Sequence, residues 1–331
     1  MSDALVKHWY HNGPLAFVLL PLSWLYCALA QRRRRNIERH RQPLFTNRHV
    51  PVIVVGNITV GGTGKTPMVI WLAQSLRANG YQPGIVSRGY GGSAIDTPQE
   101  VNSGRDAREV GDEALVMARG AECPVWVCKR RRDAIQALVQ HNPRTDVVIS
   151  DDGLQHYAMP RDIEIVMIDG DRRFGNHLCL PSGPLRESLK RLNEVDFRVV
   201  KGKPGAAAEY GMEIGGELLV NLKAAGRRMP LHDMAGQCVH ALAGVGNPQI
   251  FFDKLTSAGL KVIPHVYRDH HRFTLEDLSF DDDLPVSMTE KDTVKCGVFA
   301  ELKHWYLPIK ARPDAAFLGA LLRKLKELPR G

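Results

Sequence analysis

The sequence predicts an α/β protein built from a parallel-sheet domain and a second, smaller α/β lobe, with a membrane-associated helix at the N-terminus. Three observations lead to this prediction. Residues 15–30 are almost continuously apolar, short β-branched runs alternate with amphipathic stretches from Val52 onward, and a glycine-rich loop follows the first of these runs. The 331 residues, 44% of them hydrophobic and 24% charged, suffice for two folded units. We expect the helical segment over residues 1–35, the first domain over 36–204 and the second lobe over 205–331.

The apolar N-terminal segment has about sixteen residues, fewer than the roughly 20 that a transmembrane helix needs. We therefore expect a helix that lies in the membrane interface or enters it shallowly, with a full span as the alternative. A cleavable signal peptide is not expected, because the positive charge follows the apolar run instead of preceding it.

The excess positive charge is concentrated directly after this apolar run. Six arginines and one glutamate give residues 32–41 a net charge of +5, out of +8 for the whole chain. We expect this cluster to contact anionic lipid head groups on the cytoplasmic side, whereas a solvated charge run is the alternative. Because the excess forms one local patch, no nucleic-acid partner is expected. The six cysteines show no paired spacing, which is typical of reduced thiols in a cytosolic compartment.

The rest of the chain carries two series of alternating strands and helices. A break at Lys201-Gly202-Lys203-Pro204 separates them. Such alternation implies a parallel sheet covered on both faces. The expected strands of the first series are 52–55, 83–87, 125–128, 147–150 and 164–168, with helices at 67–79, 112–118 and 132–141. The second series comprises strands at 239–243, 261–265 and 285–288 and a helix at 248–258.

A phosphate-binding loop is predicted between the first strand and the first helix. Its glycines let backbone N–H groups turn toward phosphate oxygens at a helix N-terminus, where anions are favoured. We expect Lys65 to reach the β- and γ-phosphates of a nucleotide and Thr66 to bind Mg²⁺. Thr59 replaces a glycine of the strict pattern, and a glycine-rich turn with an incidental lysine is the alternative. The predicted nucleotide-binding residues of this P-loop NTPase-like domain are Thr59, Gly61, Gly62, Thr63, Gly64, Lys65 and Thr66.

Two carboxylates follow the strand expected at residues 147–150. Asp151 and Asp152 end an apolar run about 85 residues after the phosphate loop, the arrangement that holds Mg²⁺ opposite such a loop. An apolar run followed by aspartate is common by chance. Its combination with the loop makes a magnesium site the favoured interpretation.

Seven motifs, in order along the chain, resemble those of the tetraacyldisaccharide 4′-kinase family, the lipid A 4′-kinases of Gram-negative bacteria. The resemblance extends from the apolar segment to about residue 300, and the joint occurrence of the motifs is highly specific. Ser182 is a small departure, since the family pattern has alanine there. The motifs are GNITVGGTGKTP at 56–67, SRGYG at 87–91, VGDE at 110–113, DDGLQH at 151–156, LPSGPLRE at 180–187, DHHRF at 269–273 and MTEKD at 288–292.

The resemblance implies two α/β lobes joined by a hinge, with ATP and Mg²⁺ as cofactors. It further implies transfer of the γ-phosphoryl group of ATP to the 4′-hydroxyl of a tetraacyldisaccharide 1-phosphate, the lipid A precursor. The implied location is the cytoplasmic face of the bacterial inner membrane, where the N-terminal helix would make the protein peripheral or monotopic.

The resemblance also implies roles for individual residues. Asp112 matches the proposed catalytic base, and His270 matches the partner that orients or polarises it, with Lys65 acting on the phosphates. From the residues alone, Asp112 is more simply a helix-start carboxylate and His270 a loop histidine. Glu187 would be a further magnesium ligand beside Thr66, Asp151 and Asp152, directly or through water; the alternative is an exposed acid at a helix start. Arg88 and Arg186 are candidates for holding phosphates or for pairing with structural carboxylates.

Two other functions stay open at this point. One is a membrane-tethered P-loop ATPase or GTPase whose hydrolysis drives the movement of a partner. Thr289-Glu290-Lys291-Asp292 resembles the guanine-reading loop of GTPases, but threonine replaces the first asparagine, which favours ATP. The other is a binding protein that uses the arginine cluster as a nucleic-acid arm, an interpretation that the adjoining apolar run disfavours.

Overall fold

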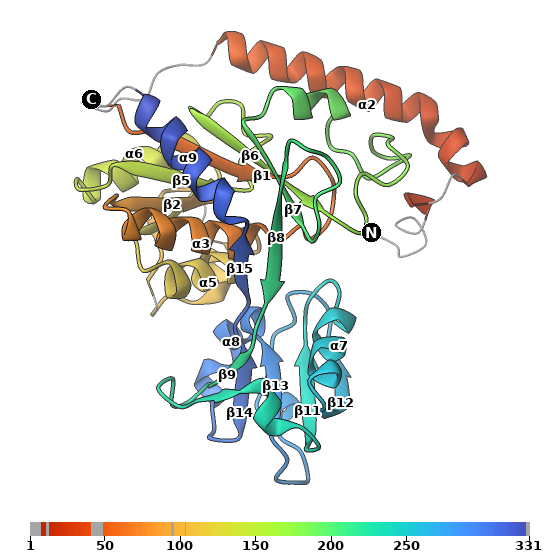
Figure 1. Ribbon diagram of the computed structural model, residues 1–331, viewed down its shortest axis with the longest axis vertical. Coiled ribbons are helices and arrows are strands. Elements are labelled where there is room, and N and C mark those ends of the chain that lie inside the picture. The colour runs from red at the N-terminus through yellow and green to blue at the C-terminus, as the bar shows by residue number, and fades with distance from the viewer. Residues whose placement is uncertain (1–7, 11–12, 41–48, 94–95, 103, 329–331) are drawn as a thin grey trace.

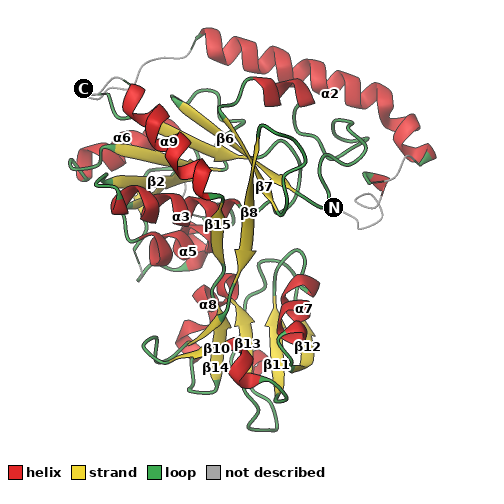
Figure 2. Ribbon diagram, viewed as in Figure 1, coloured by secondary structure: helices red, strands yellow, loops and turns green. Residues whose placement is uncertain are grey.

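The computed structural model describes residues 8–10, 13–40, 49–93, 96–102 and 104–328. These residues form a large α/β domain, a smaller α/β lobe below it in the view of Figure 1, and a long helix along the outer side of the large domain. Figure 2 shows that each unit is a sheet with helices packed against it. The predicted fold class, a mixed α/β protein with a parallel sheet and an apolar N-terminal helix, is confirmed.

The large sheet has nine strands in the order β15-β8-β7-β6-β1-β5-β2-β4-β3. Neighbours from β8 to β4 are parallel, and the outermost strands β15 and β3 pair antiparallel. β1 (Val52–Gly56) lies in the middle and is buried at every position, as its continuous apolar run requires. The other strands are β2 (Pro83–Ser87), β3 (Gln99–Glu100), β4 (Val125–Val127), β5 (Val147–Asp151), β6 (Ile163–Asp169), β7 (Phe197–Lys201), β8 (Glu209–Gly215) and β15 (Lys310–Pro313).

Helices cover both faces of the large sheet. Alternate residues of β1 point to opposite faces, so that Ile53 and Val55 join one core with residues of α3, α5 and α9, while Val52 and Val54 join a second core with residues of α6. All four side chains are fully buried. The helices of this domain are α3 (Lys65–Ala78), α4 (Ala107–Val110), α5 (Asp112–Ala121), α6 (Arg131–His141), α9 (Ala315–Glu327) and the 3₁₀ helix η1 (Leu189–Asn193).

The small lobe has a six-stranded sheet in the order β10-β9-β14-β13-β11-β12. Its four strands from β14 to β12 are parallel, and β9 and β10 extend it antiparallel. The strands are β9 (Leu218–Asn221), β10 (Arg228–Pro230), β11 (Cys238–Ala243), β12 (Lys261–Val266), β13 (Val286–Thr289) and β14 (His304–Leu307). The helices are α7 (Gln249–Ser257), α8 (Glu290–Cys296) and the 3₁₀ helices η2 (Leu231–Met234), η3 (Glu276–Leu278) and η4 (Gly297–Phe299).

The topology does not match the expected boundary between residues 204 and 205. The glycine and proline residues there form a turn between two strands of one sheet: the N–H of Gly202 donates to the carbonyl of Met212 at 2.9 Å. β8 and β15 therefore belong to the large sheet, and Phe317 of α9 belongs to the core packed against that sheet. The small lobe is an insertion, residues 216–309, between the neighbouring strands β8 and β15.

The N-terminal helix α2 (Pro14–Arg39) has 26 residues and is about 39 Å long. It thus extends past the expected limit at residue 35, while residues 1–7 and Arg41 of the basic cluster lie outside the described residues. One side of α2 is docked on the large domain. The hydroxyl of Ser23 donates to the carbonyl of Cys179 at 2.8 Å, and that of Tyr26 donates to the carbonyl of Arg186 at 3.3 Å.

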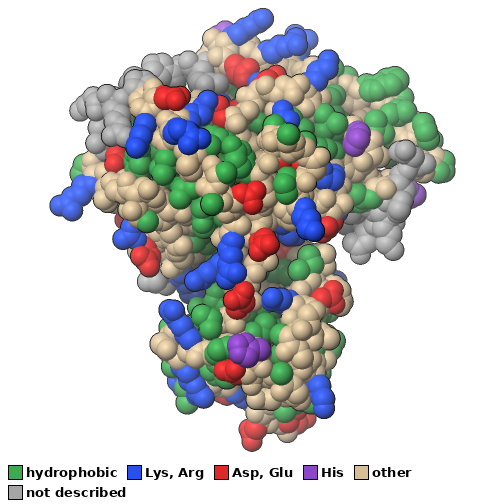
Figure 3. Space-filling model, in the orientation of Figure 1, with side chains coloured by type: hydrophobic (Ala, Val, Ile, Leu, Met, Phe, Trp, Pro, Cys, Tyr) green, Lys and Arg blue, Asp and Glu red, His purple; other side chains and the backbone are tan. Residues whose placement is uncertain are grey.

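The opposite side of α2 leaves large apolar side chains exposed. Phe17 is 63% exposed and Trp24 67% exposed, and Val18, Leu22, Leu25 and Leu29 lie near them. Figure 3 shows hydrophobic side chains gathered at one end of this helix and Lys and Arg side chains along the other. Within the described residues, α2 is the one helix that is long and apolar enough to cross a membrane. Its docked side nevertheless fixes it along the protein surface.

Candidate active site

The phosphate-binding loop connects β1 to α3 and requires glycine at two positions. Gly64 has a φ of 82°, and a Cβ atom there would lie 2.5 Å from Cδ1 of Ile214 on β8. Gly61 has a φ of 110°, and a Cβ atom there would lie 3.0 Å from the guanidinium of Arg172. Glycine adopts both conformations without steric strain and leaves room for these neighbours, which is why the loop has glycine at these two positions. Thr63, between them, is almost completely buried.

Lys65 begins α3 and points back across the mouth of the loop. Its Nζ donates to Oδ1 of Asn57 at 3.1 Å and lies 3.3 Å from Oδ1 of Asp152. Asn57 is buried, and its amide nitrogen donates to the carbonyl of Thr59 at 2.7 Å, which holds the loop closed. Thr66 lies in the first turn of α3 beside Lys65. The structure thus brings the predicted nucleotide-binding residues together at the N-terminus of one helix.

Asp151 ends β5, the strand paired with β1, and is buried. Its Oδ2 accepts a hydrogen bond from the hydroxyl of Ser87 at 3.0 Å, whereas its buried Oδ1 has no hydrogen-bond partner among the described residues. Burial, together with the nearby carboxylates of Glu113 and Asp152, raises the pKa of Asp151 to about 7. A cation at this position would stabilise the ionised carboxylate of Asp151.

Asp152 follows with a left-handed backbone, φ 44°. Its carboxylate lies 3.3 Å from Lys65 and 3.5 Å from Nη1 of Arg186. Burial opposes ionisation, but Lys65 and Arg186 outweigh it and lower the pKa of Asp152. The two adjacent carboxylates therefore lie in opposite electrostatic environments.

The oxygen atoms at this position fit a magnesium ion. Asp151 supplies an unpartnered, buried carboxylate oxygen, and Asp152 and Thr66 supply further hard oxygen donors at the same end of the sheet. No group of three or more His, Cys, Asp or Glu side chains arranged to hold a metal occurs within the described part of the chain. Magnesium sites typically have only a few protein ligands, and substrate phosphates and water usually complete the coordination of the ion.

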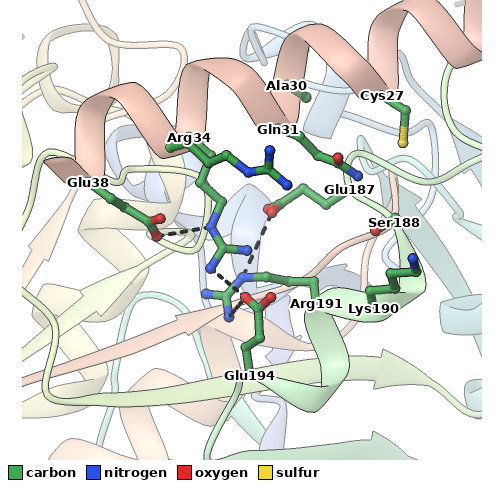
Figure 4. A pocket seen from close by; sticks show the side chains of 11 residues that line it. Cys27, Ala30, Gln31, Arg34, Glu38, Glu187, Ser188, Lys190, Arg191 and Glu194 are labelled. Atoms are coloured by element: carbon green, nitrogen blue, oxygen red, sulfur yellow. Dashed lines mark hydrogen bonds and ion pairs between the residues drawn. The ribbon is translucent and has the colours of Figure 1, made fainter.

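Glu187 lies beneath α2, among the side chains that line a pocket between this helix and the large domain (Figure 4). Its Oε1 accepts from the side-chain amide of Gln155 at 2.7 Å, and its Oε2 accepts from the hydroxyl of Tyr157 and lies 3.8 Å from Nε of Arg191. The amide of Gln155 also donates to the carbonyl of Asn57 at 3.0 Å. Glu187 is thereby joined to the phosphate loop through Gln155, and its role as a magnesium ligand stays a prediction.

Asp112 and His270 meet at the junction of the two units. Asp112 is the first residue of α5 in the large domain, and His270 lies in the loop after β12 of the small lobe. Nδ1 of His270 lies 3.0 Å from Oδ2 of Asp112, and Nζ of Lys295 lies 3.4 Å from the same oxygen. A Cβ atom at Gly111, directly before Asp112, would lie 2.4 Å from the carbonyl oxygen of Tyr90, so the start of α5 lies against the loop that follows β2. The Asp112–His270 pair thus lies at the same end of the large sheet as Asp151, which accepts a hydrogen bond from Ser87 of β2.

Two residues of this site are not evident from the sequence. Arg131 is 1% exposed, and its guanidinium donates to the backbone carbonyls of Asp151 at 3.0 Å and Cys128 at 3.4 Å. It stands within three consecutive arginines, and nothing in that run marks which one is buried. Lys295 lies four residues after Lys291, and this helical spacing is the one available signal that both face the same neighbour.

The chain is similar throughout its length to proteins of one kind. Residues 15–326 match the family model described as tetraacyldisaccharide-1-P 4′-kinase. The chain is 47% identical over 329 residues to the tetraacyldisaccharide 4′-kinase of Methylobacillus flagellatus, with 99% of this chain and 97% of the relative covered. It is 43% identical over 328 residues to the protein of the same name from Pseudomonas aeruginosa PAO1, with 99% and 98% covered.

A solved structure has a similar fold. The crystal structure of the "apo" form of LpxK from Aquifex aeolicus in complex with ATP superposes with a TM-score of 0.79 and 25% sequence identity, covering 94% of this chain and 99% of the other. The family match, the two relatives and the fold agree with the resemblance carried by the seven sequence motifs. The chain belongs to the tetraacyldisaccharide 4′-kinase family.

Proposed function

We propose that this chain transfers the γ-phosphoryl group of ATP to the 4′-hydroxyl of a tetraacyldisaccharide 1-phosphate, a step in lipid A biosynthesis. The names of the family and of its relatives support the reaction, and the ATP of the similar Aquifex aeolicus structure supports the donor. The observation that carries the proposal is the pairing of Asp112 with His270, in which Oδ2 of Asp112 lies 3.0 Å from Nδ1 of His270. The same protein has a phosphate loop whose Lys65 contacts the carboxylate of Asp152.

ATP is bound by the loop between β1 and α3. Backbone N–H groups of residues 61–66 and the N-terminal end of α3 bind the phosphates, and Lys65 moves from Asp152 and Asn57 to the β- and γ-phosphates. Release from Lys65 leaves Oδ1 of Asp152 available to a cation, while Oδ2 keeps its contact with Arg186.

Asp151, Asp152 and Thr66 are the residues that would hold Mg²⁺, and Glu187 would assist through Gln155 or a water molecule. When bound, the ion neutralises negative charge on the phosphates and aligns them. The buried, unpartnered Oδ1 of Asp151 is the feature of this chain that favours such an ion.

Asp112 accepts the proton of the attacking hydroxyl. A sugar hydroxyl has a pKa far above 7, so removal of its proton during attack lowers the barrier. The hydroxyl oxygen forms a bond to the γ-phosphorus, the bond from that phosphorus to the bridging oxygen breaks, and ADP leaves with the electron pair. His270 contacts Oδ2 of Asp112, orients this carboxylate and stabilises its negative charge.

The lipid acceptor explains the exposed side of α2. Its apolar face, with Phe17 and Trp24 more than half exposed, enters the acyl region of a membrane, while the arginines that follow contact anionic head groups. The hydrogen bonds of Ser23 and Tyr26 to the large domain favour a helix that lies along the membrane surface and not across the bilayer. The arginines that follow the apolar run favour the cytoplasmic face of the bacterial inner membrane. The protein is then peripheral or monotopic.

The test uses ATP labelled at the γ-phosphate, phospholipid vesicles and tetraacyldisaccharide 1-phosphate. We expect label in the lipid, in an amount that depends on Lys65, and a ³¹P–¹H correlation between the new phosphate and the proton on carbon 4′. Label found in inorganic phosphate alone would contradict the kinase assignment and favour an ATPase.

A further inference from the structure

Helix α8 of the small lobe lies against helix α5 of the large domain. Two lysines one helical turn apart, Lys291 and Lys295, occupy the side of α8 that meets α5. Nζ of Lys291 lies 3.5 Å from the carboxylate of Glu113 and 3.2 Å from that of Asp269. Glu113 belongs to the large domain and Asp269 to the small lobe, so this lysine joins the two units electrostatically.

Lys295 makes the corresponding bridge in a more buried position and to Asp112 itself. Its Nζ lies 3.4 Å from Oδ2 of Asp112 and 3.2 Å from Oδ1 of Asp292. The side chain of Lys295 is 10% exposed, compared with 20% for Lys291, and its ammonium lies 5.3 Å from the centre of the Phe273 ring. Salt screens such a buried interaction far less than one at the surface.

Asp292 is the fixed end of this bridge. It is fully buried, and its Oδ2 accepts hydrogen bonds from the N–H of Gly244 at 3.0 Å and from the hydroxyl of Thr289 at 2.6 Å. These bonds join it to the end of β11 and to the start of α8. Its Oδ1, which has no hydrogen-bond partner among the described residues, faces Lys295. The small lobe thus sets the position of the ammonium group.

Asp112 is the other end. Nδ1 of His270 and Nζ of Lys295 both contact its Oδ2, from two separate elements of the small lobe. Oδ1 of Asp112 is thereby the oxygen left to accept the proton of a hydroxyl. The titratable groups around Asp112 are His270 and Asp269 from the loop after β12, Lys291, Asp292 and Lys295 from α8, and Glu113 on its own helix.

We propose that Lys295 is a positioning residue for phosphoryl transfer: it ties the carboxylate of Asp112 in the large domain to the anchored Asp292 of the small lobe, so that the base is oriented only while the two units are held together. This inference rests on the proposed function, because it takes Asp112 as the base. Lys291 makes a second bridge one turn away and strengthens the same alignment.

The alternative is that Lys295 merely neutralises the buried Asp292. Removal of the lysine would then destabilise the fold, since an uncompensated buried charge is costly, without a specific effect on catalysis. The two roles are separable because one lysine contacts two aspartates. Replacing Asp292 as well removes the unpaired charge but does not restore the tether on Asp112.

The experiment compares steady-state kinetics and melting temperatures of the full chain with Lys295→Met, Lys295→Arg and the double variant Lys295→Met/Asp292→Asn. Lys295→Met is expected to lower kcat by about 10- to 100-fold, because a small misplacement of a catalytic group is enough for such a loss. The KM for ATP should stay within about twofold, since the phosphate loop is untouched. Lys295→Arg keeps the charge and should recover part of kcat.

The double variant decides between the two roles. Its melting temperature should be higher than that of Lys295→Met, while its kcat should stay low. Recovery of both kcat and melting temperature in the double variant would overturn the proposal. A wild-type kcat for Lys295→Met would overturn it as well. Lys324→Met is the matched control. Nζ of Lys324 on α9 lies 2.7 Å from Oδ1 of Asp196, and this ion pair is not part of the junction between the two units. The kcat of Lys324→Met should be unchanged. Asp112→Asn in the same assay distinguishes failure of the proposed function from failure of this inference. A fully active Asp112→Asn variant would refute the assignment of Asp112 as the base. An inactive Asp112→Asn variant together with a Lys295→Met variant of wild-type activity would refute only the role of Lys295.

Discussion

Nδ1 of His270 lies 3.0 Å from Oδ2 of Asp112, so a histidine of the small lobe contacts the carboxylate that begins helix α5 of the large domain. Asp112→Asn keeps the shape of the side chain but cannot accept a proton. We expect kcat to fall by about 10²- to 10⁴-fold, the usual contribution of general base catalysis. His270→Gln should cost less, because it removes a partner of the base and not the base. Calorimetric titration with ATP provides the control, since nucleotide binding should persist in both variants.

The phosphate loop leads to a second prediction. Lys65→Ala removes a side chain that contacts both Asn57 and Asp152 at the mouth of the loop. Transfer of label to lipid should fall by at least about 10²- to 10³-fold, the usual cost of losing one preorganised charge-stabilising group. Vesicle binding should be unchanged, because α2 is intact. Lys129→Ala is the matched control, since this lysine is 58% exposed and pairs with Asp96 at 3.7 Å; retained transfer in Lys65→Ala would contradict the proposed role.

Magnesium dependence tests the carboxylate at the end of β5. Asp151→Asn replaces the buried, unpartnered Oδ1 by an uncharged group. We expect the magnesium concentration for half-maximal activity to rise by about 10- to 100-fold, in the range found when metal-site residues are altered. Chelation of magnesium should abolish transfer in the wild-type protein. Asp281→Asn, on the surface of the small lobe, should behave as wild type; an unchanged magnesium requirement in Asp151→Asn would remove this residue from the site.

Membrane association should depend on the exposed side of α2. The double variant Phe17→Ser/Trp24→Ser removes two large exposed apolar groups and keeps the docking contacts of Ser23 and Tyr26. Each such group contributes about 1.5 to 3 kcal/mol when fully buried, so partitioning onto anionic vesicles should drop by at least about 100-fold. The KM for the lipid should rise while ATP binding is retained.

A matched double variant in the small lobe, Leu275→Ser/Val298→Ser, removes side chains that are 54% and 84% exposed. It should bind vesicles as the wild-type protein does. Equal loss of binding in both double variants, measured by flotation, would mean that α2 is not the specific contact.

His156 predicts a dependence of stability on pH. Burial lowers the pKa of His156 to about 4, and the nearby Arg131, Arg88 and Arg161 act in the same direction. Its pKa in the unfolded chain is about 6.5, so its contribution to stability is complete above that pH and is lost as the pH falls from 6.5 toward 4. The loss amounts to at most about 1.4 kcal/mol for each pH unit.

Urea unfolding between pH 7.5 and 5 measures this contribution. His156→Gln should show a smaller decrease in the free energy of unfolding over that range than the wild-type protein. His232→Gln serves as the control, because the side chain of His232 is 81% exposed and its removal should leave the decrease unchanged. Identical decreases in all three proteins would refute the assignment.

The centre of the large sheet was predictable because its strands are short, uninterrupted apolar runs. β1, β2, β5 and β6 were placed within one or two residues of their observed bounds. β8 and β15 were not, since β8 carries two glycines and two glutamates and β15 contains a proline. Such sequences become strands through pairing with each other and with β7, which is a tertiary effect that local patterns do not contain.

The candidate site divides in the same way. The phosphate loop and the Asp151–Asp152 pair are local motifs, and both could be read from consecutive residues. Asp112 and His270 are 158 residues apart and come together only because the inserted lobe folds back onto α5. Their pairing was anticipated from the family resemblance and not from spacing. Lys295 had no motif of its own and became visible only with its two carboxylates in place.

The insertion of the small lobe between β8 and β15 sets an order for events on the ribosome. The lobe is synthesised in full before β15 and α9, so it can fold while the large sheet still ends in the unpaired edge of β8. Ile214 of β8, whose side chain lies under Gly64, pairs with Ala311 of β15. β15 therefore completes the support of the phosphate loop, although it is synthesised after the loop itself. A nascent chain arrested before β15 would expose the aggregation-prone edge of β8 beside a phosphate loop that lacks this support.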